Sequence, residues 1–359
     1  MSIVLHRGSG CRFTETDASP KIRPAFKQRR GGHTVIFDRP PVISGRMSVV
    51  GDKEGNGPLG RYFQRVEKDI KMGEKCFEQA ELKMLEGAIE GAVYDSGKSV
   101  RDVDLLISGD LLNQLTSSSY AARSLNMPHI GVYSACSTMT EAMALGACFI
   151  NAGYFDTVAC ATVSHFATAE RQYRYPLEYG CQRPPYAQWT VTGAACSLLS
   201  SDGAGVKVKS ATFGKVVDFG VNDLNNMGAA MAPAAMHSLI TLFQETNTFP
   251  KDYDLILTGD LGKLGSDILR DLMREQGYAL GNNYSDCGAM IYDADQHCYQ
   301  GGSGAGCSSA VVNSFVIDKM LAGDYGRVAY FATGALMSPQ SCYQGESIPC
   351  ISHGVVLEV

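Results

Sequence analysis

No stretch of this sequence stays apolar for the roughly twenty residues that a bilayer-spanning helix needs. The longest apolar run, Ala142–Phe155, is interrupted by two glycines and an asparagine, which is typical of a buried helix. No apolar segment follows Arg7, so a secretory signal peptide is not indicated. These absences predict that any contact with a membrane is peripheral.

The 12 cysteines also lack the spacings of a metal or redox motif, because the sequence has no C-x-x-C pair and no zinc-like Cys/His cluster. Several of them, such as Cys148, Cys160 and Cys196, have apolar neighbours, which is typical of buried thiols in a reducing compartment. Tryptophan occurs once against 39 glycines, a composition that suits tightly packed α/β layers. We therefore expect an intracellular protein.

Negative charge exceeds positive charge by six, but the charge is unevenly distributed. Residues 1–33 contain seven Lys or Arg and two acidic residues, so this segment carries +5 and the rest of the chain −11. The segment has no apolar periodicity, and we expect a basic N-terminal extension without fixed structure. An acidic body argues against nucleic-acid binding, whereas the extension would suit either solvent or an anionic partner such as lipid.

A pattern of ten residues occurs twice in the chain. Residues 102–111 read DVDLLISGDL and residues 252–261 read DYDLILTGDL, with six identities at an offset of 150. Each reads as a buried parallel strand that leads into a loop. A second pair follows in the same order, because Cys136 and Cys307 each precede a helical segment that ends at a glycine before another apolar strand. The two pairs together indicate an internal duplication.

Cys136 is the candidate nucleophile of the sequence. The apolar segment 129–135 leads to it, and the residues after it have helical spacing, so Cys136 is expected at a helix N-terminus. Free N–H groups and the helix dipole at such a position lower the pKa of a thiol and favour the thiolate. The alternative is a small buried cysteine in a turn.

Residues 120–138, YAARSLNMPHIGVYSACST, resemble the segment before the acyl-accepting cysteine of thiolases and ketoacyl synthases. Further distinctive segments are GPLG at 57–60, GDLLN at 109–113, ACST at 135–138, SHFATAERQYRYPLEYG at 164–180, MAPAA at 231–235, GGSG at 301–304 and ESIPCISHG at 346–354. In these segments the chain is similar to the stage V sporulation protein AD family of spore-forming bacteria. The resemblance implies a thiolase-like α/β fold with two duplicated halves in a layered α-β-α-β-α core. We assign 1–33 to the extension, 34–205 to the N-terminal half and 206–359 to the C-terminal half.

Condensing enzymes of this superfamily combine the cysteine with His and Asn partners, and the resemblance places Asp260 and Gly302 at those two positions. An ionised Asp260 donates no hydrogen bond to an oxyanion and would raise the pKa of Cys136. His165 and His353 are candidate substitutes for the missing base. We therefore predict a pocket without catalysis, with acyl transfer by Cys136 as the alternative.

The family resemblance also implies a ligand, dipicolinic acid, taken up into the developing spore either free or as its calcium chelate. The expected ligand-binding residues are Cys136, His165, Asp260, Gly302, Ser303 and Cys307, with Asp260 as a candidate calcium contact through the ligand. The same resemblance implies a homodimer, a location at the inner spore membrane, a role in sporulation and germination, and other stage V sporulation A membrane proteins as partners. No further cofactor is expected.

Three other features remain open at this stage. Arg171, Arg174 and Arg183 are candidates for carboxylate contacts at the pocket mouth, or else for a surface or subunit interface. The segment 227–236, MGAAMAPAAM, suits a packed core better than a lipid-facing or partner-facing surface. Asp110, the counterpart of Asp260 in the first half, is interpreted as a remnant of the ancestral turn or as a helix cap.

Overall fold

The computed structural model describes residues 29–180 and 182–359. Its ten main strands form two groups of five with the same internal order, which confirms the predicted duplication. The first group runs β5 (His129–Gly131), β4 (Leu105–Gly109), β6 (Thr157–Ser164), β8 (Gly193–Ser200) and β2 (Val42–Gly51). The second runs β11 (Tyr284–Asp286), β10 (Leu255–Thr258), β13 (Arg327–Ala335), β14 (Cys350–Glu358) and β9 (Lys207–Thr212).

The two groups meet at one edge, where a single residue pair, Val42 and Lys207, joins β2 to β9. In each group the strand that carries the repeated pattern, β4 or β10, lies parallel to both of its neighbours. Short strands complete the sheets, namely β1 (Thr34–Ile36), β3 (Arg65–Glu67) and the separate parallel pair β7 (Trp189–Thr190) and β12 (Gly302–Ser303).

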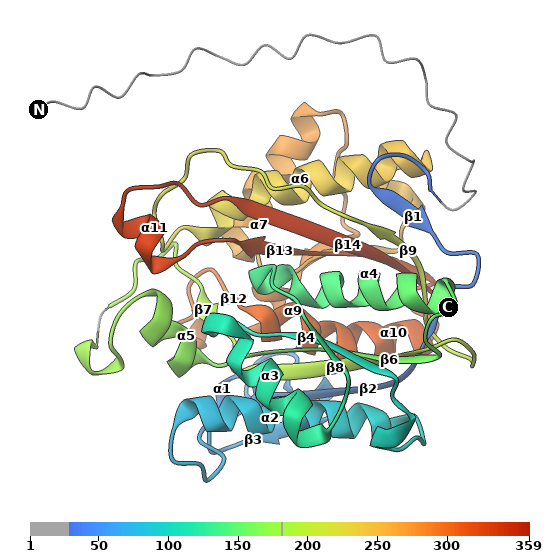
Figure 1. Ribbon diagram of the computed structural model, residues 1–359. Helices are drawn as coiled ribbons and strands as arrows, with labels where there is room; N and C mark the ends of the chain where they lie inside the picture. The colour runs from blue at the N-terminus through green and yellow to red at the C-terminus, as the bar shows by residue number, and fades with distance from the viewer. Residues whose placement is uncertain (1–28, 181) are drawn as a thin grey trace, which may run out of the picture.

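The helices complete five layers (Figure 1). The outer layers contain α2 (Phe77–Asp95) and α3 (Thr116–Leu125) on one side, and α6 (Met227–Thr246) and α7 (Gly262–Glu275) on the other. The middle layer contains α4 (Thr138–Asn151), α9 (Ala305–Val311) and α10 (Ile317–Leu321). The shorter helices are α1 (Asp52–Gly55), α5 (Phe166–Tyr173), α8 (Cys287–Ile291) and α11 (Pro339–Tyr343). This arrangement is the predicted layered α/β fold.

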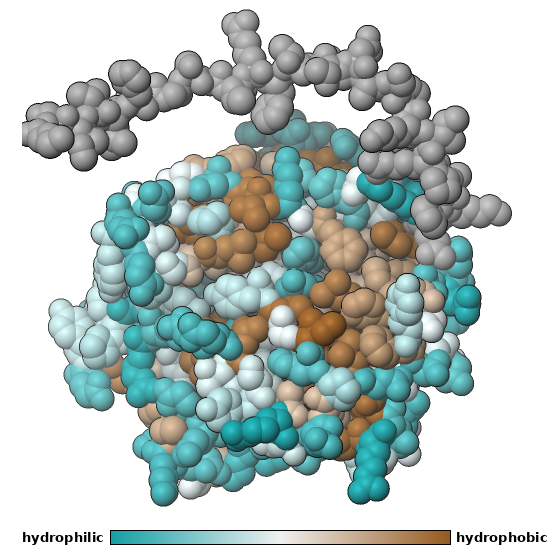
Figure 2. Space-filling model, viewed as in Figure 1, coloured by the Kyte–Doolittle hydropathy of each residue, from teal (hydrophilic) through white to brown (hydrophobic). Residues whose placement is uncertain are grey.

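Burial explains why the central strands lack the alternation of an exposed sheet. Every residue of β6 and β8 is buried, because helices cover both faces of their sheet. Helix α4 contacts β6 of one sheet and β14 of the other, so the main core lies between the sheets. On the face shown in Figure 2 the larger apolar areas lie over the middle and upper layers, and the bottom layer is mostly hydrophilic.

The predicted glycine stops are present after both middle helices. Gly153 and Gly323 have φ angles of 77° and 84°. These angles lie in the left-handed region, which glycine adopts without the steric penalty that a Cβ would cause. The next amides, of Tyr154 and Asp324, bond back to the carbonyls of Phe149 and Lys319. Each helix therefore ends in the hydrogen-bonding pattern of a Schellman motif, which turns the chain into the following strand.

Residues 1–28 of the expected N-terminal extension lie outside the described residues. Residues 29–33 depart from the expectation of no fixed structure, because Glu245 on α6 accepts hydrogen bonds from the amides of Gly32, His33 and Thr34. The physical reason is that the carboxylate of Glu245 accepts hydrogen bonds from three successive backbone amides. Because Glu245 is far from these amides in the sequence, no local pattern predicts the contact.

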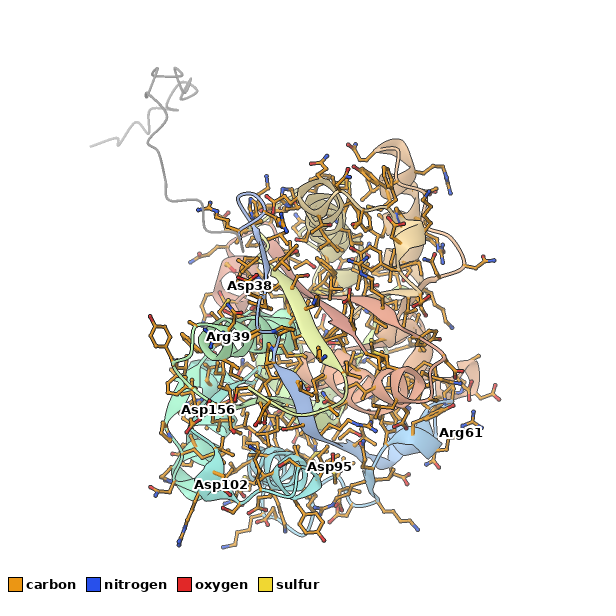
Figure 3. The ribbon with its side chains drawn as sticks, turned by 90° about the vertical axis from the view of Figure 1, so that its right-hand side faces the viewer. Asp38, Arg39, Arg61, Asp95, Asp102 and Asp156 are labelled. Atoms are coloured by element: carbon orange, nitrogen blue, oxygen red, sulfur yellow. The ribbon has the colours of Figure 1, made fainter. Side chains whose placement is uncertain are left out.

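The two ends of the molecule differ in what they expose and in which elements lie there. Viewed from the right-hand side of Figure 1, six charged and exposed side chains are marked in Figure 3: Asp38, Arg39, Arg61, Asp95, Asp102 and Asp156. The opposite end, on the left of Figure 1, contains α5, α11 and the β7–β12 pair. The carboxyl ends of β4 and β10 approach this second end, and the predicted site lies there.

Candidate functional site

Cys136 lies in a tight turn, Ala135–Ser137, that leads directly into α4. Ala135 before it has a φ angle of +50°, which is a strained conformation for a residue with a side chain. The turn is held from the other half of the molecule, because the Ser137 hydroxyl donates to the carbonyl of Ala332 at 2.8 Å and accepts from the amide of His353 at 3.0 Å. Strands β13 and β14 therefore position Cys136.

Asp260 follows β10 and is only 1% exposed. Its Oδ1 accepts a hydrogen bond from the Thr333 hydroxyl at 2.8 Å, and its Oδ2 accepts from the amide of Gly304 at 3.3 Å. Burial raises the pKa of Asp260 to about 7, and the nearby carboxylate of Asp286 adds to this rise, whereas the hydrogen bonds oppose it. Asp260 therefore exchanges a proton near neutral pH.

Asp260 is also the hydrogen-bond partner of the Cys136 thiol. Burial raises the pKa of Cys136 well above its ordinary value, and the charge of Asp260 raises it further, against a smaller opposing effect of the Gly304 amide. The expectation that a helix N-terminus favours the thiolate is therefore wrong here, because desolvation and a neighbouring carboxylate outweigh the dipole.

A narrow pocket of about 60 Å³ opens beside these two residues. Its wall is mostly apolar, with two tyrosines, three methionines and a small number of polar groups. The sixteen lining residues are Leu111, Tyr133, Ala135, Cys136, Ala169, Glu170, Tyr173, Arg174, Thr190, Met227, Met231, Asp260, Ser303, Gly304, Ala335 and Met337. The pocket draws on both halves of the chain, as expected for a duplicated fold.

Of the six predicted ligand-binding residues, Cys136, Asp260 and Ser303 line this pocket. Gly302 lies behind the wall, where its carbonyl accepts a hydrogen bond from Gln188 and an added Cβ would lie 2.7 Å from Ile291. Cys307 also lies behind it and is fully buried, with its thiol directed at the carbonyl of Gly259. The last two residues shape the wall without facing the pocket.

Neither candidate histidine reaches the pocket. His165 caps α5, where its Nδ1 accepts from the amide of Ala167 and its Nε2 bonds the carbonyl of Ile70 at 2.9 Å. His353 is held by the amide of Gly214, and burial lowers its pKa to about 4. The prediction of His165 as a pocket residue thus differs from its position in the structure, because its bonds as a helix cap turn the ring away.

The structure separates the three arginines of segment 171–183. Arg171 forms an ion pair with Glu78 on α2 and is not among the residues that line the pocket. Arg183 pairs with Glu170 and stacks over the ring of Trp189 at 4.7 Å. Arg174 alone of the three lines the Cys136 pocket.

Sequence reasoning missed the aromatic part of the site. Tyr133 lies three residues before Cys136, and its hydroxyl is 3.1 Å from that of Tyr173 on α5. The Tyr173 hydroxyl also donates to the carbonyl of Leu111 at 2.5 Å. Met227 and Met231 belong to the segment predicted as packed core, which is largely buried, and both also line the pocket. Only the position of Tyr133 next to the Cys136 turn gave a signal in the sequence.

Asp110 is the counterpart of Asp260 in the first half of the chain, but its hydrogen bonds are to backbone amides of the segment that follows it. Its carboxylate accepts from the amides of Leu112 and Ser118, at 2.9 and 2.8 Å, so it holds the loop before α3 and the first turn of that helix. This contact is consistent with the helix-capping interpretation.

Residues 29–180 and 182–359 contain no group of three or more His, Cys, Asp or Glu side chains that could hold a metal ion. Among the helices of those residues, none combines the length and apolar character needed to cross a bilayer.

Solved structures with a similar architecture include a 3-oxoacyl-[acyl-carrier-protein] synthase and OleA. The chain aligns with 3-oxoacyl-[acyl-carrier-protein] synthase III from Aquifex aeolicus at a TM-score of 0.55 and 10% identity, covering 89% of this chain and 99% of that one. It aligns with cerulenin-bound OleA from Xanthomonas campestris at a TM-score of 0.57 and 12% identity, covering 90% and 100%. At these identities the similarity establishes the thiolase-like fold alone.

Sequence comparison is more specific. Stage V sporulation protein AD of Bacillus subtilis strain 168 is 42% identical over 328 residues, which cover 91% of this chain and 97% of that protein. The family model "Stage V sporulation protein AD (SpoVAD)" matches residues 31–358. The chain therefore belongs to the stage V sporulation protein AD family of sporulation proteins.

Proposed function

We propose that this protein binds dipicolinic acid in the Cys136 pocket without catalysing a reaction, and that binding supports uptake of the acid into the developing spore. The observation that carries the proposal is the pairing of the Cys136 thiol with the buried carboxyl group of Asp260. The pairing argues against catalysis, and the rest of the wall supports binding.

The case against acyl transfer begins with the nucleophile. A thiol attacks as its thiolate, and both burial and Asp260 disfavour the thiolate of Cys136. No His or Asn occurs among the described residues that line the pocket, so neither a neutral imidazole nor a carboxamide is at hand to stabilise an oxyanion. The loss of one such donor typically slows an acyl-transfer enzyme by about 10²–10³.

The case for binding rests on the chemistry of the lining. Dipicolinate is a flat aromatic ring with two carboxylates, and the wall supplies the rings of Tyr133 and Tyr173, the guanidinium of Arg174 and the residues Thr190 and Ser303, which carry hydroxyls. Asp260, with its pKa near 7, is able to accept a proton when an anion enters, which removes the repulsion. The pocket thus suits a small anionic aromatic ligand.

Calcium enters this proposal as part of the cargo. In a calcium chelate the ligand supplies oxygen donors of its own, and an ionised Asp260 would add one more carboxylate oxygen. Asp260 would then either contact calcium or, when protonated, donate a hydrogen bond to a carboxylate of the ligand. Equal dipicolinate affinity of Asp260→Ala and the unaltered protein, with and without calcium, would exclude both roles.

The biological setting is part of the same proposal. The protein would act as a homodimer at the inner spore membrane and pass its ligand to other stage V sporulation A membrane proteins. Membership of a sporulation family supports a spore-related role.

Isothermal titration calorimetry with dipicolinate, in the presence of Ca²⁺ or of a chelator, tests the proposal. We expect saturable one-to-one binding that Cys136→Ala and Asp260→Ala both change, whereas Cys76→Ala, at a partly exposed cysteine outside the pocket, leaves binding unaltered. Incubation with acetyl-CoA followed by mass spectrometry tests the alternative. Absence of binding under every condition, or stoichiometric acetylation of Cys136, would overturn the proposal.

A further inference from the structure

Two guanidinium groups share one carboxylate beside the pocket. Glu170 on α5 forms ion pairs with both Arg174 and Arg183, and the side chains of the three residues are only 9–11% exposed. Removing charged groups from water is unfavourable unless each is paired, so a partly buried cluster with one surplus positive charge needs an explanation.

The two arginines are not equally satisfied. Arg183 pairs closely with Glu170, donates to the carbonyl of Gln188 at 2.7 Å and stacks on the parallel rings of Phe166 and Trp189. Arg174 reaches the same two acceptors only at 3.4 Å, and both contacts use its Nη1. Arg183 therefore neutralises Glu170, and Arg174 keeps most of its donor capacity.

The surrounding charges leave Arg174 without another strong partner. Among the lining residues of the pocket, the charged groups are Arg174, Glu170 and Asp260. Asp260 is bonded to Thr333 and Gly304, and Asp223 in the adjoining hollow bonds Tyr186 and the amide of Asn225. A guanidinium with unused donors thus lines a pocket whose wall also includes Thr190 and Ser303, which are register partners in the β7–β12 pair.

We propose that Arg174 is the residue that binds a carboxylate of the ligand, and that Arg183 and Glu170 act as positioning residues. Arg183 pairs with Glu170. Without Arg183, the carboxylate of Glu170 would pair more closely with Arg174 and neutralise the positive charge of Arg174. The proposal rests on the proposed binding function and specifies the ligand class as an aromatic dicarboxylate, with one carboxylate on Arg174 and the other directed at Thr190 and Ser303. A planar guanidinium suits this role because it forms two parallel hydrogen bonds to a carboxylate.

Calorimetry with two ligands tests the assignment. Dipicolinate has two carboxylates and picolinate has one, so the ratio of their affinities measures the contribution of the second carboxylate. We expect Arg174→Gln to weaken dipicolinate binding by about 10- to 100-fold, as for a charged hydrogen bond, and to bring the ratio close to one. Arg174→Lys keeps the charge without the fork and should fall between, whereas Arg171→Gln, at the exposed arginine that pairs with Glu78, should leave both affinities unchanged.

The positioning role of Arg183 is tested by a second substitution that should restore dipicolinate binding. Arg183→Gln should weaken dipicolinate binding because Glu170 then pairs with Arg174, and the second substitution Glu170→Gln in the same protein should restore binding. A purely structural role of Arg183 would show no such rescue. Thermal unfolding of each variant checks that it folds.

A measurement on the unaltered protein covers the case in which Arg174 variants do not fold. Phenylglyoxal modifies arginines, and bound dipicolinate should protect Arg174 from it while Arg171 stays reactive. If dipicolinate binds but neither Arg174→Gln nor protection shows an effect, the assignment of Arg174 is wrong and the binding function stands. If dipicolinate does not bind at all, the binding function and the assignment fail together.

Discussion

The Thr333 hydroxyl donates a hydrogen bond of 2.8 Å to Asp260 Oδ1, from the strand that lies beside the one preceding Asp260. This contact stabilises the ionised form of a carboxyl group that burial would otherwise keep protonated. The balance places the pKa of Asp260 at about 7, so that the charge of the pocket changes within the physiological range of pH.

Binding of dipicolinate without calcium should therefore depend on pH. Below pH 7 Asp260 is mostly neutral, and above pH 7 its negative charge repels the dianion, so we expect the affinity to fall as the pH rises from about 6 to 8. Calorimetric titrations across this range measure the change. Asp260→Asn, which is neutral at every pH, should remove the dependence.

Thr333→Val provides the matched control for this prediction. Valine has nearly the shape of threonine but donates no hydrogen bond, so the pKa of Asp260 should rise and the midpoint of the pH profile should move to higher pH. A midpoint that stays in place, or a profile that Asp260→Asn leaves intact, would assign the pH dependence to another group.

Cys136 should react slowly with iodoacetamide at pH 7.5. Each unit by which the pKa of a thiol rises lowers its thiolate fraction about tenfold, so we expect alkylation at least about tenfold slower than that of glutathione in the same solution. Asp260→Asn should accelerate it because one cause of the raised pKa is then absent. Mass spectrometry of the peptides gives the rate for each cysteine, and faster alkylation of Cys136 than of partly exposed Cys76 would contradict the prediction.

Gly334 should not tolerate a side chain. A Cβ at this position would lie 1.9 Å from the carbonyl oxygen of Ser134, in the turn that carries Cys136. We expect Gly334→Ala to lower the free energy of unfolding by about 1–3 kcal/mol, measured by urea denaturation, and to weaken dipicolinate binding. Gly326→Ala is the control, because Gly326 immediately precedes the same strand and an added Cβ would lie 3.4 Å from its nearest neighbour. An equal effect of both substitutions would refute the argument.

The contact between Glu245 and residues 32–34 should be lost at low pH. Burial of Glu245 acts against ionisation, but its hydrogen bonds with Thr34, Gly32 and His33 outweigh this effect and lower its pKa. A lowered pKa in the folded state stabilises the contact above the ordinary pKa near 4.5, and this stabilisation disappears as the pH falls through the folded value.

Hydrogen exchange measures this contact directly. We expect Glu245→Ala to accelerate exchange of the Gly32, His33 and Thr34 amides at neutral pH, as acidification does in the unaltered protein. Glu275→Ala, at the end of α7, should leave the three amides protected. Protection that persists in Glu245→Ala would show that another group holds the segment.

The sequence predicted those parts of the structure that neighbouring residues determine, namely the repeated strands and the ends of the middle helices. The repeated strands ending at Asp110 and Asp260, and the glycine stops at Gly153 and Gly323, have periodicity and backbone preferences that can be read without a third dimension. Cys136 became a candidate through its predicted position at a helix N-terminus, and the family resemblance placed Asp260 at the position of a catalytic partner. Neither pattern indicated the contact between the two residues.

Side-chain direction in irregular segments could not be predicted in this way. His165 follows a strand that ends near the site, yet its bonds to Ala167 and Ile70 turn its ring away. Arg174 and Arg171 are three residues apart on or near one helix, and only the position of Glu78 and Glu170 decides which of them faces the pocket. Two of these partners, Ile70 and Glu78, are distant in the chain from the residues that they hold, so no local pattern indicates them.

The bonds of Ser137 to Ala332 and His353 have a consequence for the history of the molecule. The cysteine lies in the first copy of the repeat, but the second copy holds the turn on which it is displayed. A descendant that lost the second copy would lose the shape of its pocket, even though no cysteine of that copy is among the described residues that line it. The two copies have therefore become unequal, and the first depends on the second for the position of its cysteine.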